Sequence, residues 1–387
     1  MIGIVIILLA PFAVLTTFFV VEVIAGLPAS RFRCAGSNRM SAVVIVPAHD
    51  EALVIGDTVA ALTAALPEGV RLLVVADNCS DTTAEIARSA GVEVIERNDA
   101  DRRGKGHALA FAAEHLASDP PDVLAVLDAD CRMDSPSLMA LVSAAGSGGP
   151  AQAVNLLRPD KANPPLVQIS TFAFMLKNLV RQRGLQRIAG RVHLTGTGMA
   201  MPYGLFSASG KVRSSIVEDL AQGLELAEAG HHPELVGDAT VWSGASTEEG
   251  TLTQRRRWEG GFLATSLRQA PKLILKSVVK GDVRSALAGL DLLVPPLALF
   301  ALLNVAALAI ASLLSLALKL DWWPVVLQLG LLVVALLAIF VVWLREGRQF
   351  ISLGVLTRLP LYAMWKLPMY LGLAKRGTPG DWLRTGR

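Results

Sequence analysis

The sequence has few cysteines and few charges. Its three cysteines are far apart and form no CxxC pair, which excludes a disulfide framework and a cysteine zinc site and suits a reducing compartment. Only 18% of the 387 residues are charged, and the net charge of +3 gives no excess of cations that would indicate a nucleic-acid partner. Because 52% of the residues are hydrophobic, we expect part of the chain to lie in a lipid bilayer.

The first long apolar run extends from Ile2 to Leu27, which is long enough to cross the roughly 30 Å hydrocarbon layer as one helix. No charged residue precedes Glu22, so we expect a retained signal anchor, with Glu22 reaching into the lipid headgroups. Arg31, Arg33 and Arg39 follow the run. By the positive-inside rule, this cluster places the amino terminus outside and the next segment in the cytoplasm.

Two later apolar runs, Leu290 to Leu318 and Trp323 to Leu344, predict a helical hairpin in the membrane. The stretch 350–373 is interrupted by charges and prolines, so we expect it to lie in the membrane interface. The sequence therefore predicts a multi-pass protein of the cytoplasmic membrane with three spans. Its expected parts are an anchor with a basic flank (1–39), a cytoplasmic domain (40–270) and a membrane region with a basic tail (271–387).

Short β-rich runs alternate with helical patterns between the membrane parts, which is typical of a doubly wound α/β domain. In such a domain the ligand crevice lies beyond the carboxyl ends of the parallel strands. The expected strands are Val43–Val46, Leu72–Val75, Val92–Ile95 and Val123–Leu127, and the expected helices are 52–66, 82–90 and 105–116.

Acidic residues, rather than a glycine-rich phosphate loop, follow the first two strands, which disfavours a dinucleotide fold. Glu51 and Asp77 are placed where a carboxylate can accept hydrogen bonds from ribose hydroxyls or from base N–H groups. Asp81 is expected only to cap the helix after it. Lys105 follows a glycine at the start of the next helix, where such a turn can hold a phosphate.

The strongest signal is Asp128-Ala129-Asp130, directly after a buried strand. Two carboxylates one residue apart at a strand end can divide their roles between a divalent metal and the donor sugar or ribose. Oxygen ligands suit Mg²⁺ or Mn²⁺, which would bridge diphosphate oxygens and stabilise the charge of the leaving group. A plain acidic loop is the alternative, and the position at the crevice favours the metal.

Three later motifs complete the pattern. The turn from Thr195 to Met199 has small residues that let a ligand approach the backbone. Glu218 and Asp219 begin a helix, where acids are favourable in any case, and one of them could act as a base. The segment Gln254 to Trp258 offers arginines for a diphosphate and an indole for a sugar ring, or else a basic patch for anionic lipid. A metal with one base fits sugar transfer better than hydrolysis, which pairs two carboxyl groups across the bond.

Taken in order, these motifs resemble the processive branch of family 2 glycosyltransferases, which includes cellulose, chitin, hyaluronan and poly-N-acetylglucosamine synthases. The likeness covers Val43 to Trp258 and ends in the Gln-x-x-Arg-Trp motif of Gln254, Arg257 and Trp258. It implies an α/β GT-A (Rossmann-like) glycosyltransferase domain inserted between transmembrane helices. It also implies an inverting reaction and a nucleotide-diphosphate sugar, a UDP-sugar, as the donor.

The resemblance further implies a role for each site residue. Asp219, beside Glu218, would be the catalytic base, and Asp130 would hold the Mg²⁺ or Mn²⁺ ion. The remaining roles would be donor binding by Glu51, Asp77, Lys105, Asp128 and Arg257, and acceptor binding by Gly196, Thr197, Gly198, Gln254 and Trp258.

The acceptor is left open between a growing polysaccharide or glycan and a membrane lipid that receives a single sugar, as in ceramide glucosyltransferase-like enzymes with the same motif. Three spans are few for a polymer channel, so a processive enzyme would need a homo-oligomer or a secretion partner. A catalytically silent membrane scaffold should lack one of the carboxylates, and all are present. A nucleotidyltransferase would leave Gln254 to Trp258 unexplained.

Overall fold

The computed structural model describes residues 2–29, 40–209, 218–244, 248–319 and 321–376. The expected basic flank at Arg31, Arg33 and Arg39 and the end of the basic tail lie outside these described residues. The chain divides into two compact units. The helical unit comprises Met1–Pro28, Pro159–Ala189 and Ala245–Arg387, and the α/β unit comprises Ala29–Arg158 and Gly190–Gly244.

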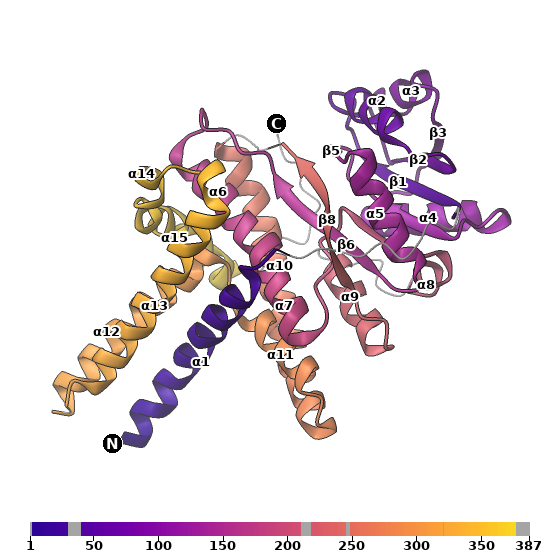
Figure 1. Cartoon of the computed structure of the whole chain (residues 1–387). Helices are drawn as coiled ribbons and strands as arrows, with labels where there is room; N and C mark the ends of the chain where they lie inside the picture. The colour runs from indigo at the N-terminus through magenta and orange to yellow at the C-terminus, as the bar shows by residue number, and fades with distance from the viewer. Residues whose placement is uncertain (1, 30–39, 210–217, 245–247, 320, 377–387) are drawn as a thin grey trace. The chain divides into compact units, whose positions relative to one another are not determined.

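The α/β unit is built on an eight-stranded sheet with the order β3-β2-β1-β4-β7-β6-β8-β5 (Figure 1). The first four strands in this order run parallel, β7 is antiparallel to both of its neighbours, and β5 is antiparallel to β8. The strands are β1 (Ala42–Ala48), β2 (Val70–Asp77), β3 (Glu93–Arg97), β4 (Val123–Val126), β5 (Cys131–Arg132), β6 (Ala151–Leu157), β7 (Met199–Pro202) and β8 (Glu234–Ser243).

The four strands predicted from the sequence coincide with β1 to β4, and the doubly wound α/β arrangement is confirmed. The other four strands were not predicted, and they make the sheet mixed rather than parallel throughout. β5 has two residues, too few to carry a periodic pattern, and β7 has the sequence MAMP, which ends in a proline that argues against a strand. The helices of this unit are α2 (Ile55–Ala65), α3 (Thr83–Ser89), α4 (Lys105–His115), α5 (Ser135–Gly146), α8 (Tyr203–Ala208) and α9 (Glu218–Glu228), with a 3₁₀ turn, η1, at Leu116–Ser118.

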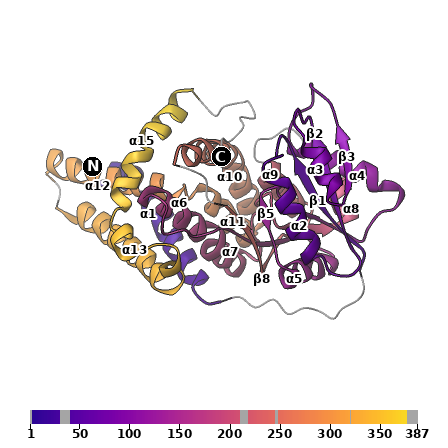
Figure 2. The same cartoon turned by 90° about the horizontal axis from the view of Figure 1, so that it is seen from above.

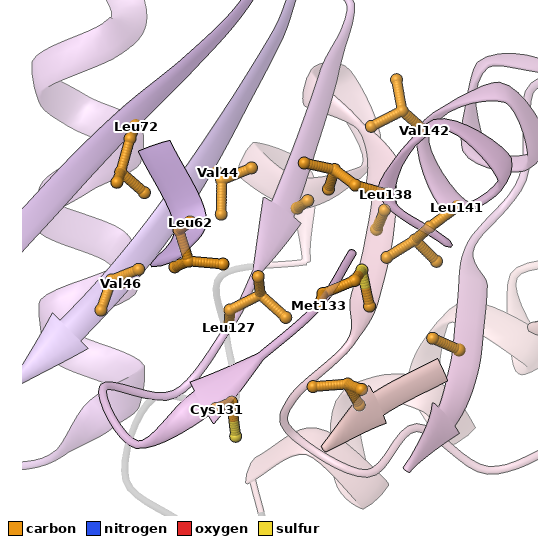
Figure 3. Close-up of a cluster of buried hydrophobic side chains, with 14 of the residues drawn as sticks. Val44, Val46, Leu62, Leu72, Leu127, Cys131, Met133, Leu138, Leu141 and Val142 are labelled. Atoms are coloured by element: carbon orange, nitrogen blue, oxygen red, sulfur yellow. The ribbon is translucent and has the colours of Figure 1, made fainter. Parts of the chain in front are cut away.

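Both faces of this sheet are covered by a buried apolar layer. Successive residues of a strand point to opposite faces. Val44 of β1 therefore belongs to the cluster that includes Leu62 of α2 and Leu138 of α5, which Figure 3 shows in close-up. Its neighbour Ile45 belongs to the other cluster, with Leu109 of α4. Because both faces are buried there, the central strands β1 and β4 are continuously apolar, whereas β6 carries the polar residues Gln152 and Asn155 within its length.

The helical unit contains the long apolar helices of the chain. Its helix α12 lies beside α13, and α1 contacts both of them (Figure 2). The helices of this unit are α1 (Ile2–Gly26), α6 (Pro165–Met175), the π-helix η2 (Leu176–Arg181), α7 (Gln182–Ala189), α10 (Glu248–Lys280), α11 (Val283–Leu293), α12 (Leu297–Ala317), α13 (Trp323–Arg345), the 3₁₀ turn η3 (Gly347–Gln349), α14 (Leu353–Leu356) and α15 (Leu359–Arg376).

Among the described residues, three helices are long and apolar enough to cross a membrane: Val5–Gly26, Leu297–Ala317 and Trp323–Arg345. They agree in number with the three predicted spans, and in sequence they flank the α/β unit on both sides. The expected start of the second span was wrong. Pro295 and Pro296 end the preceding helix α11, because proline cannot continue a helix interior, and α12 begins only at Leu297.

A buried ion cluster joins three helices of this unit. Arg181, at the end of η2, donates to a carboxylate oxygen of Glu22 on α1 at 2.5 Å, and its guanidinium also pairs with Asp291 on α11. Burial disfavours the charged guanidinium, but the two carboxylates raise the pKa of Arg181 above its usual range. Glu22 is 0% exposed, so the expectation that it reaches into the headgroups was wrong: its charge is compensated inside the protein.

Replacing Arg181 by methionine should lower the free energy of unfolding by about 3–5 kcal/mol, because two buried carboxylates would lose their cation. Chemical denaturation of the detergent-solubilised protein measures the change. Arg284→Met on α11 is the matched control, since Arg284 is exposed and should change the stability by less than about 0.5 kcal/mol. Equal stability of the two variants would contradict a role of the cluster in holding the helices together.

Candidate active site

Three acidic residues follow the ends of neighbouring strands in the α/β unit. β2 ends at Asp77, β1 ends shortly before Glu51, and β4 ends shortly before Asp128. Because β1 pairs in parallel with both β2 and β4, the carboxyl ends of these strands lie at one edge of the sheet. Ligands of open α/β sheets bind at this edge. The structure therefore brings these three predicted site residues to the same edge.

Asp77 is a buried carboxylate, of which one oxygen accepts hydrogen bonds within the protein and the other accepts none. The residue is 2% exposed. Its Oδ1 accepts from Nη1 of Arg97 at 2.6 Å and from the side-chain amide of Asn78 at 3.1 Å. Its Oδ2 is buried and has no hydrogen-bond partner. Since an unsatisfied buried acceptor is costly, this oxygen is suited to accept an N–H group from a ligand, such as that of a nucleobase.

The Asp128-Ala129-Asp130 triplet forms a compact set of ligand atoms. One ligand atom from each of Asp128, Asp130 and Cys131 lies within 4.8 Å of the others. Burial, and then the charges of Asp130 and Asp128, raise the pKa of the Cys131 thiol well above its usual value. The residue is 1% exposed and its sulfur accepts from the Thr197 hydroxyl at 3.4 Å, so the carboxylate oxygens are the more accessible ligands. This donor chemistry fits a hard divalent ion such as Mg²⁺ or Mn²⁺.

Lys105 connects the triplet to a second part of the site. This residue begins α4 after Gly104, whose φ of 119° a residue with a side chain rarely adopts. Its ammonium group pairs with Asp128 and donates to the carbonyl oxygen of Gly196 at 2.6 Å. The backbone N–H of Asp128 also donates to the hydroxyl of Thr197 at 3.1 Å. The turn at 195–199 thus packs directly against the triplet.

This turn requires its two glycines. Gly196 has a φ of 80° and Gly198 a φ of 63°, both in the left-handed region that favours glycine. A Cβ atom on Gly198 would lie 2.6 Å from Cγ1 of Val241. A Cβ atom on Gly196 would lie 3.0 Å from Oδ2 of Asp219. The Asp219 carboxylate is therefore adjacent to Gly196, whereas the side chain of Glu218 lies outside the described residues.

Two residues that support the site were missed by the sequence reasoning. Arg97 at the end of β3 orients Asp77, as described above. Gln152 on β6 is 1% exposed. Its amide donates to the carbonyl oxygens of Thr197 at 2.9 Å and Gly198 at 3.1 Å, and its carbonyl accepts from the N–H of Thr195 at 2.9 Å. Gln152 therefore fixes the turn, and nothing in the local sequence pattern indicates this.

A second group of possible metal ligands, Asp50, Cys79 and Asp81, is already used by the backbone. Asp50 accepts from the N–H of Ser80 at 2.6 Å. Asp81 accepts from the N–H groups of Thr83 at 3.0 Å and Ala52 at 3.1 Å. Asp81 was expected to cap the helix after it, but the N-cap residue of α3 is Thr82, and Asp81 instead closes the turn before the helix. These carboxylates stabilise the loops after β1 and β2, so the group is a poor candidate for a metal site.

The Gln-x-x-Arg-Trp segment belongs to the helical unit, on α10. Arg255 is 6% exposed, donates to the Ser170 hydroxyl at 2.9 Å, and lies over the rings of Phe174 and Trp258, at 4.9 and 5.4 Å from their centroids. Arg256 is exposed. The three consecutive arginines are therefore not equivalent, because Arg255 packs inside the unit beside the tryptophan.

The sequence of this chain is similar to sequences of known glycosyltransferases. A family model described as glycosyltransferase like family 2 matches residues 39–261. Uncharacterized glycosyltransferases of Mycobacterium bovis and Mycobacterium tuberculosis are 35% identical over 105 residues, which cover 27% of this chain and 44% of each relative. The match thus spans less than half the length of these relatives.

Two solved structures were aligned with this chain, and the first of them shares its fold. A mannosyltransferase from Pyrobaculum calidifontis, in complex with GDP-Man and Mn²⁺, aligns with a TM-score of 0.55 at 18% identity, over 89% of this chain and 99% of that one. A glucosyl-3-phosphoglycerate synthase from Mycobacterium tuberculosis aligns with a TM-score of 0.37 at 17% identity, over 61% and 87%. The first alignment, together with the mixed sheet, identifies the α/β unit as a GT-A fold.

Proposed function

Because this chain belongs to glycosyltransferase-like family 2 and is a glycosyltransferase, we propose that it transfers a sugar, with inversion at the anomeric carbon, from a nucleotide-diphosphate sugar to an acceptor hydroxyl. One observation carries this proposal. Lys105 contacts both Asp128 and the Gly196 carbonyl, and Asp219 is adjacent to the same glycine. A proposed donor-binding carboxylate and a candidate base are thus both connected to one small turn.

The donor side is formed by the strand ends. In this proposal the buried Oδ2 of Asp77 accepts an N–H group of the base, and Glu51 lines the nucleoside pocket. Lys105 and Arg257 neutralise the diphosphate, and Asp128 contacts the donor. Supporting this, the mannosyltransferase with the same fold was solved with GDP-Man and Mn²⁺. The likeness to the processive branch favours a UDP-sugar, so both nucleotides belong in the test.

The reaction would be a single displacement. Asp219 takes the proton of the acceptor hydroxyl, the acceptor oxygen forms its bond to the anomeric carbon, and the bond from that carbon to the diphosphate oxygen breaks. A divalent ion held by Asp130, with Asp128 beside it, would stabilise the negative charge on the departing diphosphate. Gly196, Thr197 and Gly198 offer backbone without bulky side chains beside the acceptor, and Gln254 and Trp258 are proposed to bind it.

The acceptor is proposed to be a growing polysaccharide or glycan, or a membrane lipid that receives one sugar. The three apolar helices support an integral membrane protein. The proposal that the α/β unit lies in the cytoplasm rests on the basic residues that follow the first apolar run in the sequence. If the acceptor is a growing polysaccharide, we propose that the enzyme is processive and that it works with a secretion partner or as a homo-oligomer. The size of the product separates the two alternatives.

The test is nucleotide release by the purified protein, reconstituted in lipid, with a panel of UDP- and GDP-sugars and with Mn²⁺, Mg²⁺ or neither. Metal-dependent release with one donor, together with a sugar product of measurable size, is the expected result. Release that does not depend on a sugar donor, or none with any donor when endogenous lipid and oligosaccharide acceptors are supplied, would contradict the proposed function.

Asp77→Asn should weaken nucleotide binding by about tenfold to a hundredfold, because an amide cannot offer two acceptor oxygens and leaves Arg97 without its buried anion. Titration calorimetry with UDP and with GDP measures the change. Asp119→Asn is the control, since the Asp119 side chain is 82% exposed and pairs with Arg71. Equal affinity of the Asp77 variant and the wild-type protein would remove Asp77 from the nucleotide site.

A further inference from the structure

The residue that follows the Gln-x-x-Arg-Trp segment on α10 is held by another helix of the helical unit. Glu259 comes directly after Trp258, and its side chain is 12% exposed. Lys366 of α15 pairs with one oxygen of the Glu259 carboxylate. The hydroxyl of Tyr370, one turn further along α15, donates to the other oxygen at 2.7 Å. Both oxygens of this carboxylate are therefore bound by α15.

Lys366 is enclosed in this cluster. Its side chain is 1% exposed, and lysine is almost never fully buried unless it is paired. Its ammonium group also lies 5.1 Å from the ring centroid of Tyr362, one turn earlier on α15. Burial, and then the charge of Glu259, raises the pKa of the Tyr370 hydroxyl above its usual value, so this hydroxyl remains a neutral donor. Because Lys366 and Tyr370 are four residues apart, one face of α15 makes both bonds.

The same stretch of α10 is also held by α6. Arg255 donates to the hydroxyl of Ser170 on α6 at 2.9 Å, and the ring centroid of Phe174 on α6 lies 5.7 Å from that of Trp258. Arg255 precedes Glu259 by four residues, so the two anchoring residues lie on the same face of α10. Trp258 therefore lies between an anchor to α6 and an anchor to α15.

Such a cluster fixes an orientation more than it adds stability. The desolvation of two buried charges offsets much of their attraction, and apolar residues of similar volume often stabilise a protein equally well. The two bonds to Glu259 are directional, so they define the rotation of α10 about its axis. Successive residues of a helix differ by about 100° around this axis, so a small rotation redirects the Trp258 ring. Misplacing a substrate-binding group by about 1 Å can cost about a hundredfold in rate.

We propose that Lys366 and Tyr370 are positioning residues for sugar transfer, which act through Glu259 to fix the direction of Trp258. The inference rests on the proposed function, in which Trp258 binds the acceptor, and it goes beyond that function by giving α15 a role. α15 also contacts α12, one of the three helices apolar enough to cross a membrane. The cluster thus connects the segment around Trp258 to this apolar helix.

Tyr370→Phe is the mildest test, because it removes one hydroxyl and keeps the ring. The KM for the acceptor should rise about tenfold, since a hydrogen bond to a charged group is lost. The acceptor probes are octyl glucoside and maltotriose, and nucleotide release is the readout. Partial unfolding alone would lower the apparent kcat and leave KM unchanged. Tyr362→Phe is the matched control, because it removes a hydroxyl from the same helix and leaves both bonds to Glu259. An unchanged KM in Tyr370→Phe would overturn the proposal.

A second variant separates positioning from stability. Glu259→Leu, combined with Lys366→Met and Tyr370→Phe, replaces the cluster by apolar side chains and leaves none of its charges buried without a partner. Its free energy of unfolding in chemical denaturation should stay close to that of the wild-type protein. Its KM for the acceptor should nevertheless rise at least as much as in Tyr370→Phe alone. A wild-type KM in this variant would mean that the cluster serves stability only, and the proposal would be wrong.

A measurement without turnover observes Trp258 itself. The protein is labelled with 5-fluorotryptophan, and the fluorine NMR resonance of Trp258 is assigned by its loss in Trp258→Phe. This resonance should shift in Tyr370→Phe and in the variant without the cluster, and it should keep its position in Tyr362→Phe. A resonance that moves in neither of the first two variants would overturn the proposal. If it shifts as expected but no sugar donor gives nucleotide release in the wild-type protein, the proposed function fails while the positioning of Trp258 by α15 stands.

Discussion

Replacing Asp219 by asparagine should lower the rate of sugar transfer by about a thousandfold, within the range that general-base catalysis contributes. Asparagine has nearly the same shape, so the turn at Gly196, against which the Asp219 carboxylate lies, should keep its conformation. What is lost is the ability to accept a proton from the acceptor hydroxyl. The measurement is the initial rate of product formation at saturating donor and acceptor.

The same variant should keep metal-dependent binding of the nucleotide, because Asp77, Asp128 and Asp130 are unchanged. A loss of kcat with intact nucleotide affinity would separate a base from a residue that binds substrate. Glu218→Gln is the natural control, since Glu218 precedes Asp219 at the start of α9 and was the other candidate base. Full activity of the Asp219 variant, or a larger loss in the Glu218 variant, would show that the assignment is wrong.

The site residues that could be predicted from the sequence are those whose positions depend only on residues nearby in the chain. Asp77 and Asp128 lie at the ends of buried strands, and a continuously apolar run of four or more residues makes both the strand and its end visible. The turn was visible as a run of small residues that let a ligand approach the backbone, and the structure adds that Gly196 and Gly198 have a left-handed backbone. Such features need only a few neighbouring residues to specify them.

The parts that were missed depend on contacts between distant residues. Gln152 hydrogen-bonds to a turn that lies more than forty residues later in the chain. Glu22 pairs with Arg181, which is 159 residues away in the sequence. The charge of Glu22 within an apolar run is visible in the sequence, but neither its partner nor that of Gln152 is, because a single sequence gives no signal for the pairing.

Asp130→Asn is expected to act on binding, unlike Asp219→Asn. The neutral amide is a weaker ligand for a hard divalent ion, so the variant should lose most of the gain in nucleotide affinity that Mn²⁺ or Mg²⁺ gives the wild-type protein. Transfer should fall by at least about a hundredfold, since stabilisation of the departing diphosphate by a metal contributes several kcal/mol. Titration of UDP and GDP with and without metal measures the first effect, and initial rates measure the second.

The chain offers a matched control for this prediction. Asp50 belongs to the second group of acidic ligands, but its carboxylate accepts from the backbone N–H of Ser80, and an asparagine can keep that bond. Asp50→Asn should therefore leave the response to metal unchanged. If Asp50→Asn abolishes the response and Asp130→Asn does not, the ion binds beside β1 and β2, and the leaving group must be stabilised by Lys105 and the arginines alone. A loss in Asp130→Asn only would assign the metal to the carboxylates of the Asp128-Ala129-Asp130 triplet.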